Sequence, residues 1–170
     1  MMENIPVEIE IKLVIEMPDF SVISKMEGYT KSRITQTYLS SPSGVTHRVR
    51  KREYPDRVVY TETKKVRIDK MSSYEDEREI SAEEYSELLS RKAPDTTPVE
   101  KTRHTVRYCG RTVEIDAYPA WKRSCVLEVE LPSRDTEYAL PECIRVIRDV
   151  TGDKRYSNAA MSRAFPEELV

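Results

Sequence analysis

The sequence is poor in several residue types on which familiar protein sites depend. Its 170 residues include only four glycines, three cysteines, two histidines and one tryptophan. Four glycines are too few for a glycine-rich phosphate cradle, and no P-loop, Gly-x-Gly-x-x-Gly or Gly-x-Ser-x-Gly motif occurs. The cysteines, Cys109, Cys125 and Cys143, are odd in number and far apart, which argues against a disulfide framework or a zinc site.

Long apolar runs and a charge imbalance are also missing. No apolar stretch approaches the roughly 20 residues of a membrane-spanning helix, and the first residues, Met1–Asn4, lack the basic and apolar regions of a secretion signal. Lysine and arginine (28) nearly cancel aspartate and glutamate (30), so the net charge of −2 favours neither a nucleic acid nor a membrane surface as partner. We expect a single domain over residues 1–170, located in the cytoplasm.

Alternation of apolar and charged residues, the period of β-strands, dominates the sequence. In the stretch Val7–Leu13, for example, the odd positions are apolar and the even positions are charged. The pattern predicts eight strands, at 7–13, 32–39, 45–52, 57–68, 74–80, 99–108, 112–118 and 124–131. The fold class expected is therefore mainly β.

Three helices are predicted beside the strands, which makes the fold α+β. One follows Pro18-Asp19, and one begins at the capping box Ser81-x-x-Glu84. A third is predicted from Pro141 to Gly152, with Ile144, Ile147 and Val150 as its apolar stripe.

The strands place charges at every second position, so each has one ionic and one apolar face. One interpretation is a sandwich or barrel with an apolar interior and solvated ionic faces. The other is a barrel whose apolar faces are covered by the helices, so that the ionic faces line an internal tunnel. Acids and bases are sorted onto different strands, which suits a tunnel that binds a polyanion and cations. Charge pairing between neighbouring strands on an outer face would produce the same sorting, so both interpretations stay open on this evidence.

An ionic interior would have a definite chemistry. Arginine and lysine side chains bind phosphate oxygens, and paired carboxylates such as Glu8/Glu10 and Glu128/Glu130 suit Mg²⁺ or Mn²⁺. The histidines, His47 and His104, each adjoin an arginine placed inward, so they are predicted to face outward as surface residues.

A series of short motifs then follows in a recognisable order. These are Glu8-Ile9-Glu10-Ile11-Lys12, Arg48-Val49-Arg50, Thr63-Lys64-Lys65, Glu77-Arg78-Glu79, Lys101-Thr102-Arg103, Ile115-Asp116, Leu127-Glu128-Val129-Glu130 and the segment from Val150 to Asn158. With these motifs the sequence resembles the CYTH family of triphosphate tunnel metalloenzymes, in particular bacterial members of the inorganic triphosphatase type. The resemblance spans residues 7–160.

The resemblance implies an eight-stranded antiparallel β-barrel that forms a charged tunnel, with Mg²⁺ or Mn²⁺ as cofactor. It implies phosphate binding by Lys12, Arg48, Arg50, Lys65, Lys101, Arg103 and Lys154. It implies metal binding by Glu8, Glu10, Glu128 and Glu130, and catalytic roles for Glu8, Glu77 and Asp116. Whether Lys64 or Lys65, and Glu77 or Glu79, faces the tunnel is left open. Arg52, Arg67 and Arg107 are interpreted as rim or surface charges.

The function implied is hydrolysis of a triphosphate or polyphosphate small molecule by in-line attack of water on a terminal phosphoryl group. Inorganic tripolyphosphate is the first choice of substrate, with nucleoside triphosphates beside it. The alternatives are a class IV-type adenylate cyclase, an RNA 5′-triphosphatase, a thiamine triphosphatase that would use Trp121 as an aromatic stack, and a non-catalytic polyphosphate-binding module. A homodimer is left open.

Overall fold

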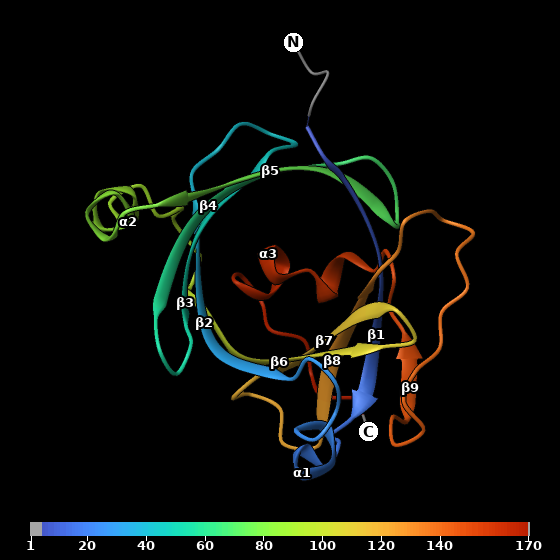
Figure 1. The fold of residues 1–170 in the computed structure, drawn as a ribbon. Helices are drawn as coiled ribbons and strands as arrows, with labels where there is room; N and C mark the ends of the chain where they lie inside the picture. Colours follow the sequence, from blue (N-terminus) through green and yellow to red (C-terminus); the bar gives the residue numbers. More distant parts are fainter. Residues whose placement is uncertain (1–4, 170) are drawn as a thin grey trace.

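The strands close into a barrel, as Figure 1 shows. The structure is a computed structural model and describes residues 5–169. The barrel strands are β1 (Val7–Glu16), β2 (Thr30–Leu39), β3 (Thr46–Glu53), β4 (Val58–Arg67), β5 (Ser72–Ile80), β6 (Val99–Tyr108), β7 (Arg111–Ala117) and β8 (Ser124–Glu130). They pair antiparallel in the order β5-β4-β3-β2-β6-β7-β8-β1, and the pairing of β1 with β5 closes the ring. The predicted fold class, mainly β with an eight-stranded antiparallel barrel, is confirmed.

The period of two places the ionic faces inside the barrel. On β1, Glu8, Glu10 and Lys12 line an internal cavity. The intervening Ile11 and Leu13 are buried in an apolar cluster outside the barrel, together with Ile23. A residue's neighbours in a strand point to the opposite face, so one buried apolar row fixes the direction of the charged row beside it.

Two short helices cover apolar parts of the outer surface. Helix α1 (Phe20–Ile23) starts at Asp19, whose carboxylate accepts a hydrogen bond from the Ser21 backbone N–H. Helix α2 (Ala82–Leu89) starts at Ser81, whose hydroxyl accepts from the Glu84 backbone N–H, and it packs Tyr85 against the barrel. Both were predicted from the sequence. No helix among residues 5–169 is long and apolar enough to cross a membrane.

The prediction of a helix from Pro141 to Gly152 is wrong. Part of this segment forms a ninth strand, β9 (Val146–Asp149), which pairs antiparallel with the second half of β1 at Val14 and Ile15. Strand β5 leaves β1 at Ile9, so backbone groups farther along β1 need another partner. The β-branched side chains of Ile144, Val146 and Ile147 also favour a strand.

The chain after β9 turns inward and closes part of the barrel. Its elements are a 3-10 helix, η1 (Lys154–Tyr156), and helix α3 (Asn158–Met161), which lies within the ring of strands in Figure 1. Tyr156 and Met161 pack against Val14, Val126 and Trp121 in a buried apolar cluster. Val14 continues the inward face of β1 beyond Lys12, so the charged interior gives way to an apolar layer at this end.

Candidate active site

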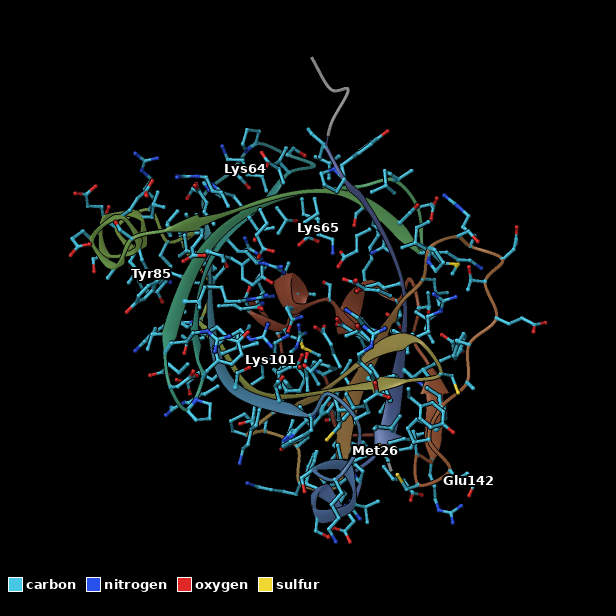
Figure 2. The ribbon with its side chains drawn as sticks, viewed as in Figure 1. Met26, Lys64, Lys65, Tyr85, Lys101 and Glu142 are labelled. Atoms are coloured by element: carbon cyan, nitrogen blue, oxygen red, sulfur yellow. The ribbon has the colours of Figure 1, made fainter. Side chains whose placement is uncertain are left out.

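The inward side chains surround a cavity of about 630 Å³. The choice between adjacent residues that the sequence left open is decided by strand register. Lys65 lines the cavity and Lys64 is exposed on the outer face, as Figure 2 shows. Glu77 likewise lines the cavity, where its carboxylate accepts a hydrogen bond from the Thr63 hydroxyl at 3.1 Å. Glu79 is not among the lining residues.

Carboxylates gather on one side of the cavity, where β1, β5 and β8 meet. Register places Glu10 opposite Glu130 and Lys12 opposite Glu128 across the β1–β8 pairing. The Lys12 ammonium lies 3.3 Å from the Glu128 carboxylate. The sequence therefore supplies the Glu-x-Glu pairs, and the pairing of β1 with β8 brings the two pairs together.

This acidic side carries more negative charge than its basic neighbours balance. Burial, and then the charge of Glu128, raise the pKa of Glu10 to about 8. Burial, and then a hydrogen bond and the charge of Glu8, raise the pKa of Glu75 to about 7. Burial, and then the charges of Glu8 and Glu114, raise the pKa of Glu130 to about 7. A cation placed here would relieve the repulsion.

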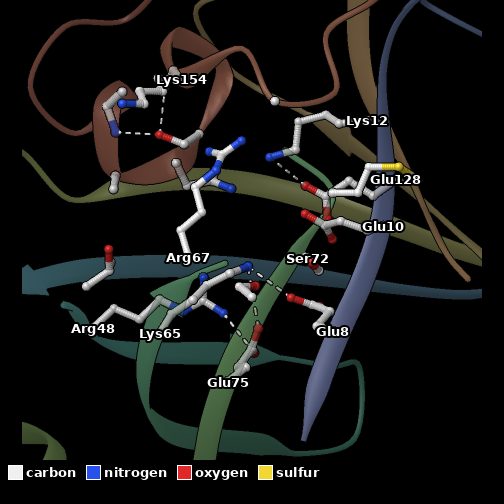
Figure 3. A pocket seen from close by; sticks show the side chains of 18 of the residues that line it. Glu8, Glu10, Lys12, Arg48, Lys65, Arg67, Ser72, Glu75, Glu128 and Lys154 are labelled. Carbon is white, nitrogen blue, oxygen red and sulfur yellow. Dashed lines mark hydrogen bonds and ion pairs between the residues drawn. The ribbon is translucent and has the colours of Figure 1, made fainter. Parts of the chain in front are cut away.

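Lys65 and Arg48 hold two of these carboxylates, as Figure 3 shows. The Lys65 ammonium lies 2.9 Å from Glu8 and 3.5 Å from Glu75, and Arg48 lies 3.6 Å from Glu75. Two buried atoms in this group have no hydrogen-bond partner among the described residues: Arg48 Nε and Glu75 Oε2. Arg48 Nε is a free donor that an anion could use, whereas Glu75 Oε2 lies 3.5 Å from the Lys65 ammonium and is engaged by its charge.

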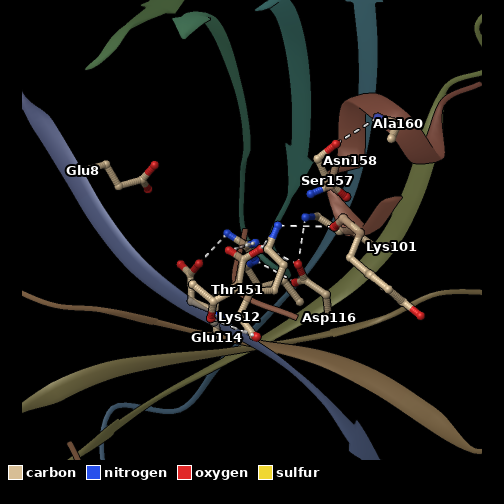
Figure 4. Close-up of polar contacts among 12 residues, drawn as sticks. Glu8, Lys12, Lys101, Glu114, Asp116, Thr151, Ser157, Asn158 and Ala160 are labelled. Carbon is tan, nitrogen blue, oxygen red and sulfur yellow. Dashed lines mark hydrogen bonds and ion pairs between the residues drawn. The ribbon is translucent and has the colours of Figure 1, made fainter. Parts of the chain in front are cut away.

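A second basic group consists of Lys101 and Arg103, and both donate hydrogen bonds to Asp116 on β7, as Figure 4 shows for Asp116 and Lys101. Asp116 is 0% exposed and is not among the residues that line the cavity. Its two oxygens accept hydrogen bonds from Lys101 Nζ at 2.7 Å and from Arg103 Nε and Nη2 at 2.7 and 2.8 Å. Lys101 and Arg103 do line the cavity, so Asp116 fixes the direction in which they point.

Arg50 and Arg52, which follow Arg48 on β3, differ from it because neutral groups of β2 hold them. Arg50 donates from Nε and Nη2 to the Gln36 side-chain oxygen, at 2.9 and 2.6 Å. Arg52 donates from Nε to the Ser32 hydroxyl at 2.8 Å. These two guanidinium groups make no ion pair with a carboxylate within residues 5–169.

The C-terminal segment completes the wall of the cavity. Lys154 of η1 and Asn158 of α3 both line it. The Asn158 side-chain oxygen accepts a hydrogen bond from the Tyr118 hydroxyl at 2.8 Å. The segment passes close to the β4–β5 turn, where a Cβ on Gly152 would lie 2.5 Å from Lys70 Cβ. Only glycine, which also has a φ of +82° here, allows this approach.

Of the site residues named from the sequence, all but Asp116 line this cavity. Sequence reasoning passed over Glu75 and Glu114, although both lie at two-residue spacing from the chosen Glu77 and Asp116, which was a usable signal. Arg52 and Arg67, which were interpreted as rim or surface charges, also line the cavity. Gln36 carries no signal of this kind, because nothing local distinguishes a glutamine that will meet an arginine of the next strand.

The histidines lie outside the cavity, as the sequence predicted, but one of them is not a surface residue. His104 is 4% exposed, stacks on the Phe20 ring at 3.9 Å between centroids, and lies 2.9 Å from the Tyr29 hydroxyl. Helix α1 covers this part of β6 and removes His104 from solvent. His47 on the outer face lies 2.7 Å from the Glu62 carboxylate.

The donors available to a metal ion are carboxylates, which Mg²⁺ and Mn²⁺ prefer. Among the described residues no group of three or more acidic, histidine or cysteine ligands converges on one point. Glu8 and Glu128 are instead engaged by Lys65 and Lys12. The donor chemistry and the raised pKa values of Glu10, Glu75 and Glu130 nevertheless fit a divalent cation on this side of the cavity.

Solved structures share this fold. The crystal structure of the inorganic triphosphatase NE1496 matches with a TM-score of 0.57 at 26% identity, over 94% of this chain and 97% of that chain. A conserved hypothetical protein from Pyrococcus furiosus matches with a TM-score of 0.58 at 22% identity, over 75% and 80% of the two chains. A putative adenylate cyclase from Vibrio parahaemolyticus matches with a TM-score of 0.53 at 10% identity, over 75% and 79%. The last two likenesses show the fold alone.

No protein-family model and no curated protein matches the sequence. The likeness to NE1496 consists of the closed barrel and a nearly full-length structural match. The chain therefore has the triphosphate tunnel fold that the resemblance to the CYTH family implied.

Proposed function

We propose that this protein is a metal-dependent hydrolase of triphosphate compounds and that inorganic tripolyphosphate is its substrate. The observation that carries the proposal is one cavity lined both by many basic side chains and by carboxylates that gather where β1, β5 and β8 meet. A polyanion and a divalent cation are the ligands that satisfy both groups at once. The match to a protein described as an inorganic triphosphatase supports this choice.

The basic residues would bind the phosphate chain. The set is Lys12, Arg48, Arg50, Lys65, Lys101, Arg103 and Lys154. Guanidinium groups bind phosphate oxygens in a bidentate manner, and the ammonium groups add point charges. Because Asp116 anchors both Lys101 and Arg103 before any ligand arrives, part of the ordering cost of binding is already met by the fold.

Glu8, Glu10, Glu128 and Glu130 would hold Mg²⁺ or Mn²⁺, with Glu75 beside them. Such an ion supplies positive charge and Lewis acidity to phosphoryl oxygens when bound. We assign Glu77 as the base that accepts the proton of the attacking water. It lines the cavity, forms no ion pair with a described lysine or arginine, and accepts a hydrogen bond from the Thr63 hydroxyl that would orient it. In this proposal Asp116 orients basic residues and has no direct catalytic role.

The lining favours an inorganic substrate over one with an aromatic group. Tyr38 is the one aromatic residue in the described lining of the cavity. Trp121 is 3% exposed, packs in the apolar cluster at the barrel end and donates a hydrogen bond to the Pro166 carbonyl at 3.0 Å. It is therefore not placed to stack on thiamine or on a nucleobase inside the cavity.

Product analysis tests the proposal. Tripolyphosphate, ATP and thiamine triphosphate are each incubated with the purified protein and Mg²⁺, Mn²⁺ or EDTA. We expect phosphate release fastest from tripolyphosphate and none with EDTA. Pyrophosphate and cyclic AMP from ATP would instead identify a cyclase. Binding of tripolyphosphate without turnover under any metal condition would leave a binding module and contradict the proposal.

Arg50→Ala tests the phosphate-binding role of β3. Arg50 lines the cavity without a carboxylate partner, so its charge is available to an anion. We expect KM for tripolyphosphate to rise by about 10- to 100-fold, the equivalent of one or two charge-assisted hydrogen bonds. Lys51→Ala is the matched control, because Lys51 is the next residue, points outward and pairs with Glu53 at 3.2 Å. Equal kinetics for the two variants would contradict the assignment.

A further inference from the structure

Gln36 on β2 makes a contact that neither its residue type nor its position in the sequence suggests. Lys12, Arg48, Lys65, Lys101 and Arg103 each lie within 3.6 Å of a carboxylate. Arg50 has no such partner among the described residues. It is held by the neutral oxygen of Gln36, which lies opposite it in the β2–β3 pairing and accepts two of its hydrogen bonds.

The Gln36 amide is fixed at both ends. Its nitrogen donates to the Tyr38 hydroxyl at 3.2 Å, so its oxygen is the end that faces Arg50. Gln36 is 0% exposed and does not line the cavity, whereas Arg50 and Tyr38 both do. Gln36 therefore acts on the cavity only through the residues that it holds.

The contact between Gln36 and Arg50 is uncharged, and so is the neighbouring contact from β2. Ser32, which holds Arg52, is the second polar contact from β2, and it too is uncharged. Burial, and then the charges of Arg48 and Arg103, lower the pKa of Arg50 to about 10. Arg50 and Arg52 thus carry positive charge without an ion pair to a described carboxylate, and the strand order places β2 and β3 across the barrel from β1.

We infer that Gln36 is a positioning residue that aims Arg50 at the substrate phosphates without neutralising its charge. This inference rests on the proposed function, since it takes a phosphate chain as the ligand of Arg50. A glutamate at this position has the same shape and would hold Arg50 as firmly. It would also bring a negative charge next to the bound polyanion and cancel the charge that attracts it.

The test is Gln36→Glu, compared with the wild type. KM for tripolyphosphate is expected to rise about tenfold, with a smaller change in kcat, because the loss is in binding. The melting temperature of the ligand-free protein should not fall, since the new carboxylate faces a buried arginine. Thr35→Glu is the matched control: it adds the same charge to the outer face of β2, opposite Lys51, and should keep wild-type kinetics.

A double-mutant cycle separates positioning from a general structural effect. If Gln36 acts through Arg50, Gln36→Glu adds no further loss in the Arg50→Ala background. If Gln36→Glu does not fold, the cycle is run with Gln36→Leu, which removes the acceptor without adding charge and should also raise KM. A wild-type KM for Gln36→Glu, or a penalty that is unchanged without Arg50, would overturn the inference.

Two measurements distinguish a failure of the proposed function from a failure of the role assigned to Gln36. They are calorimetry of tripolyphosphate binding in EDTA and phosphate release with Mg²⁺. If the wild type neither binds nor hydrolyses tripolyphosphate, the proposed function fails, and this inference fails with it. If the wild type does both and Gln36→Glu matches it, only the role of Gln36 is rejected.

Discussion

Replacing Glu10 by glutamine is expected to lower the metal-dependent kcat/KM for tripolyphosphate by at least about 100-fold. Loss of residues that merely support metal ligands costs 10- to 100-fold in many enzymes, so loss of a ligand should cost at least as much. Glu10 lies opposite Glu130 on the acidic side of the cavity, and glutamine keeps its shape without the charge. Steady-state phosphate release across a Mg²⁺ or Mn²⁺ titration measures the effect. Near-wild-type hydrolysis would remove Glu10 from the proposed ligands.

The same variant should be more stable than the wild type when no metal is present. The pKa of Glu10 is about 8 in the folded protein, against 4.5 for an unperturbed glutamate. Between these values the folded state binds a proton that the unfolded chain has released, so the wild-type free energy of unfolding decreases as pH rises. The glutamine side chain does not titrate, and the stability gain of Glu10→Gln is expected to grow from pH 4.5 to 8. Denaturation in EDTA across this range tests it, with Glu16→Gln, at the exposed end of β1, as control.

Replacing Asp116 by alanine is expected to lower the free energy of unfolding by about 3–5 kcal/mol. Asp116 is fully buried and is the counter-charge of Lys101, whose side chain is also fully buried. Without it, two basic side chains remain inside the barrel with too few acceptors. For a chain of this length the melting temperature should fall by roughly 10 °C. Thermal or chemical denaturation at neutral pH measures the loss.

The pH dependence of the stability loss in Asp116→Ala, and a control variant, test whether the loss comes from the Asp116 charge. Burial opposes ionisation of Asp116, but the charges of Arg103 and Lys101 outweigh it and hold its pKa well below its usual range. A lowered pKa gives stability that is present above the unfolded value of 3.8 and is lost as pH falls below it. On the acid side, the difference in the free energy of unfolding between wild type and variant should therefore narrow below about pH 3.8. Glu114→Gln is the control, because Arg103 keeps its bonds to Asp116, and its loss should be clearly smaller. Equal losses would contradict the anchoring role.

Some local patterns predicted local structure well, and one did not. The β1 stretch from Val7 has a strict two-residue period, which a helix cannot use, so the strand and its two faces followed directly from it, whereas the period left open which face points inward. Ile144, Ile147 and Val150 also fit the period of a helix, yet β9 formed there. The deciding factor was the edge of β1 beyond Ile9, which β5 leaves unpaired. The residues around β9 cannot reveal this edge, because it belongs to a strand far away in the sequence.

The partners of the charged residues were equally hidden. Glu8 was recognisable as a carboxylate of a Glu-x-Glu pair, but its contact with Lys65 depends on closure of the barrel through β1 and β5. Asp116 was recognisable as inward, but only the β6–β7 register showed that it lies beneath Lys101 and Arg103 and away from the cavity surface.

By itself, the sequence determined the eight barrel strands, the two capped helices and which residues share a strand face, because strand alternation and helix capping are properties of neighbouring residues. The tertiary structure alone decided which carboxylate neutralises which cation, that Gln36 leaves Arg50 charged, and that the segment after Asp149 closes one end of the barrel. These outcomes depend on the register between strands that are distant in sequence, and a shift of one residue would turn every charged side chain to the opposite face.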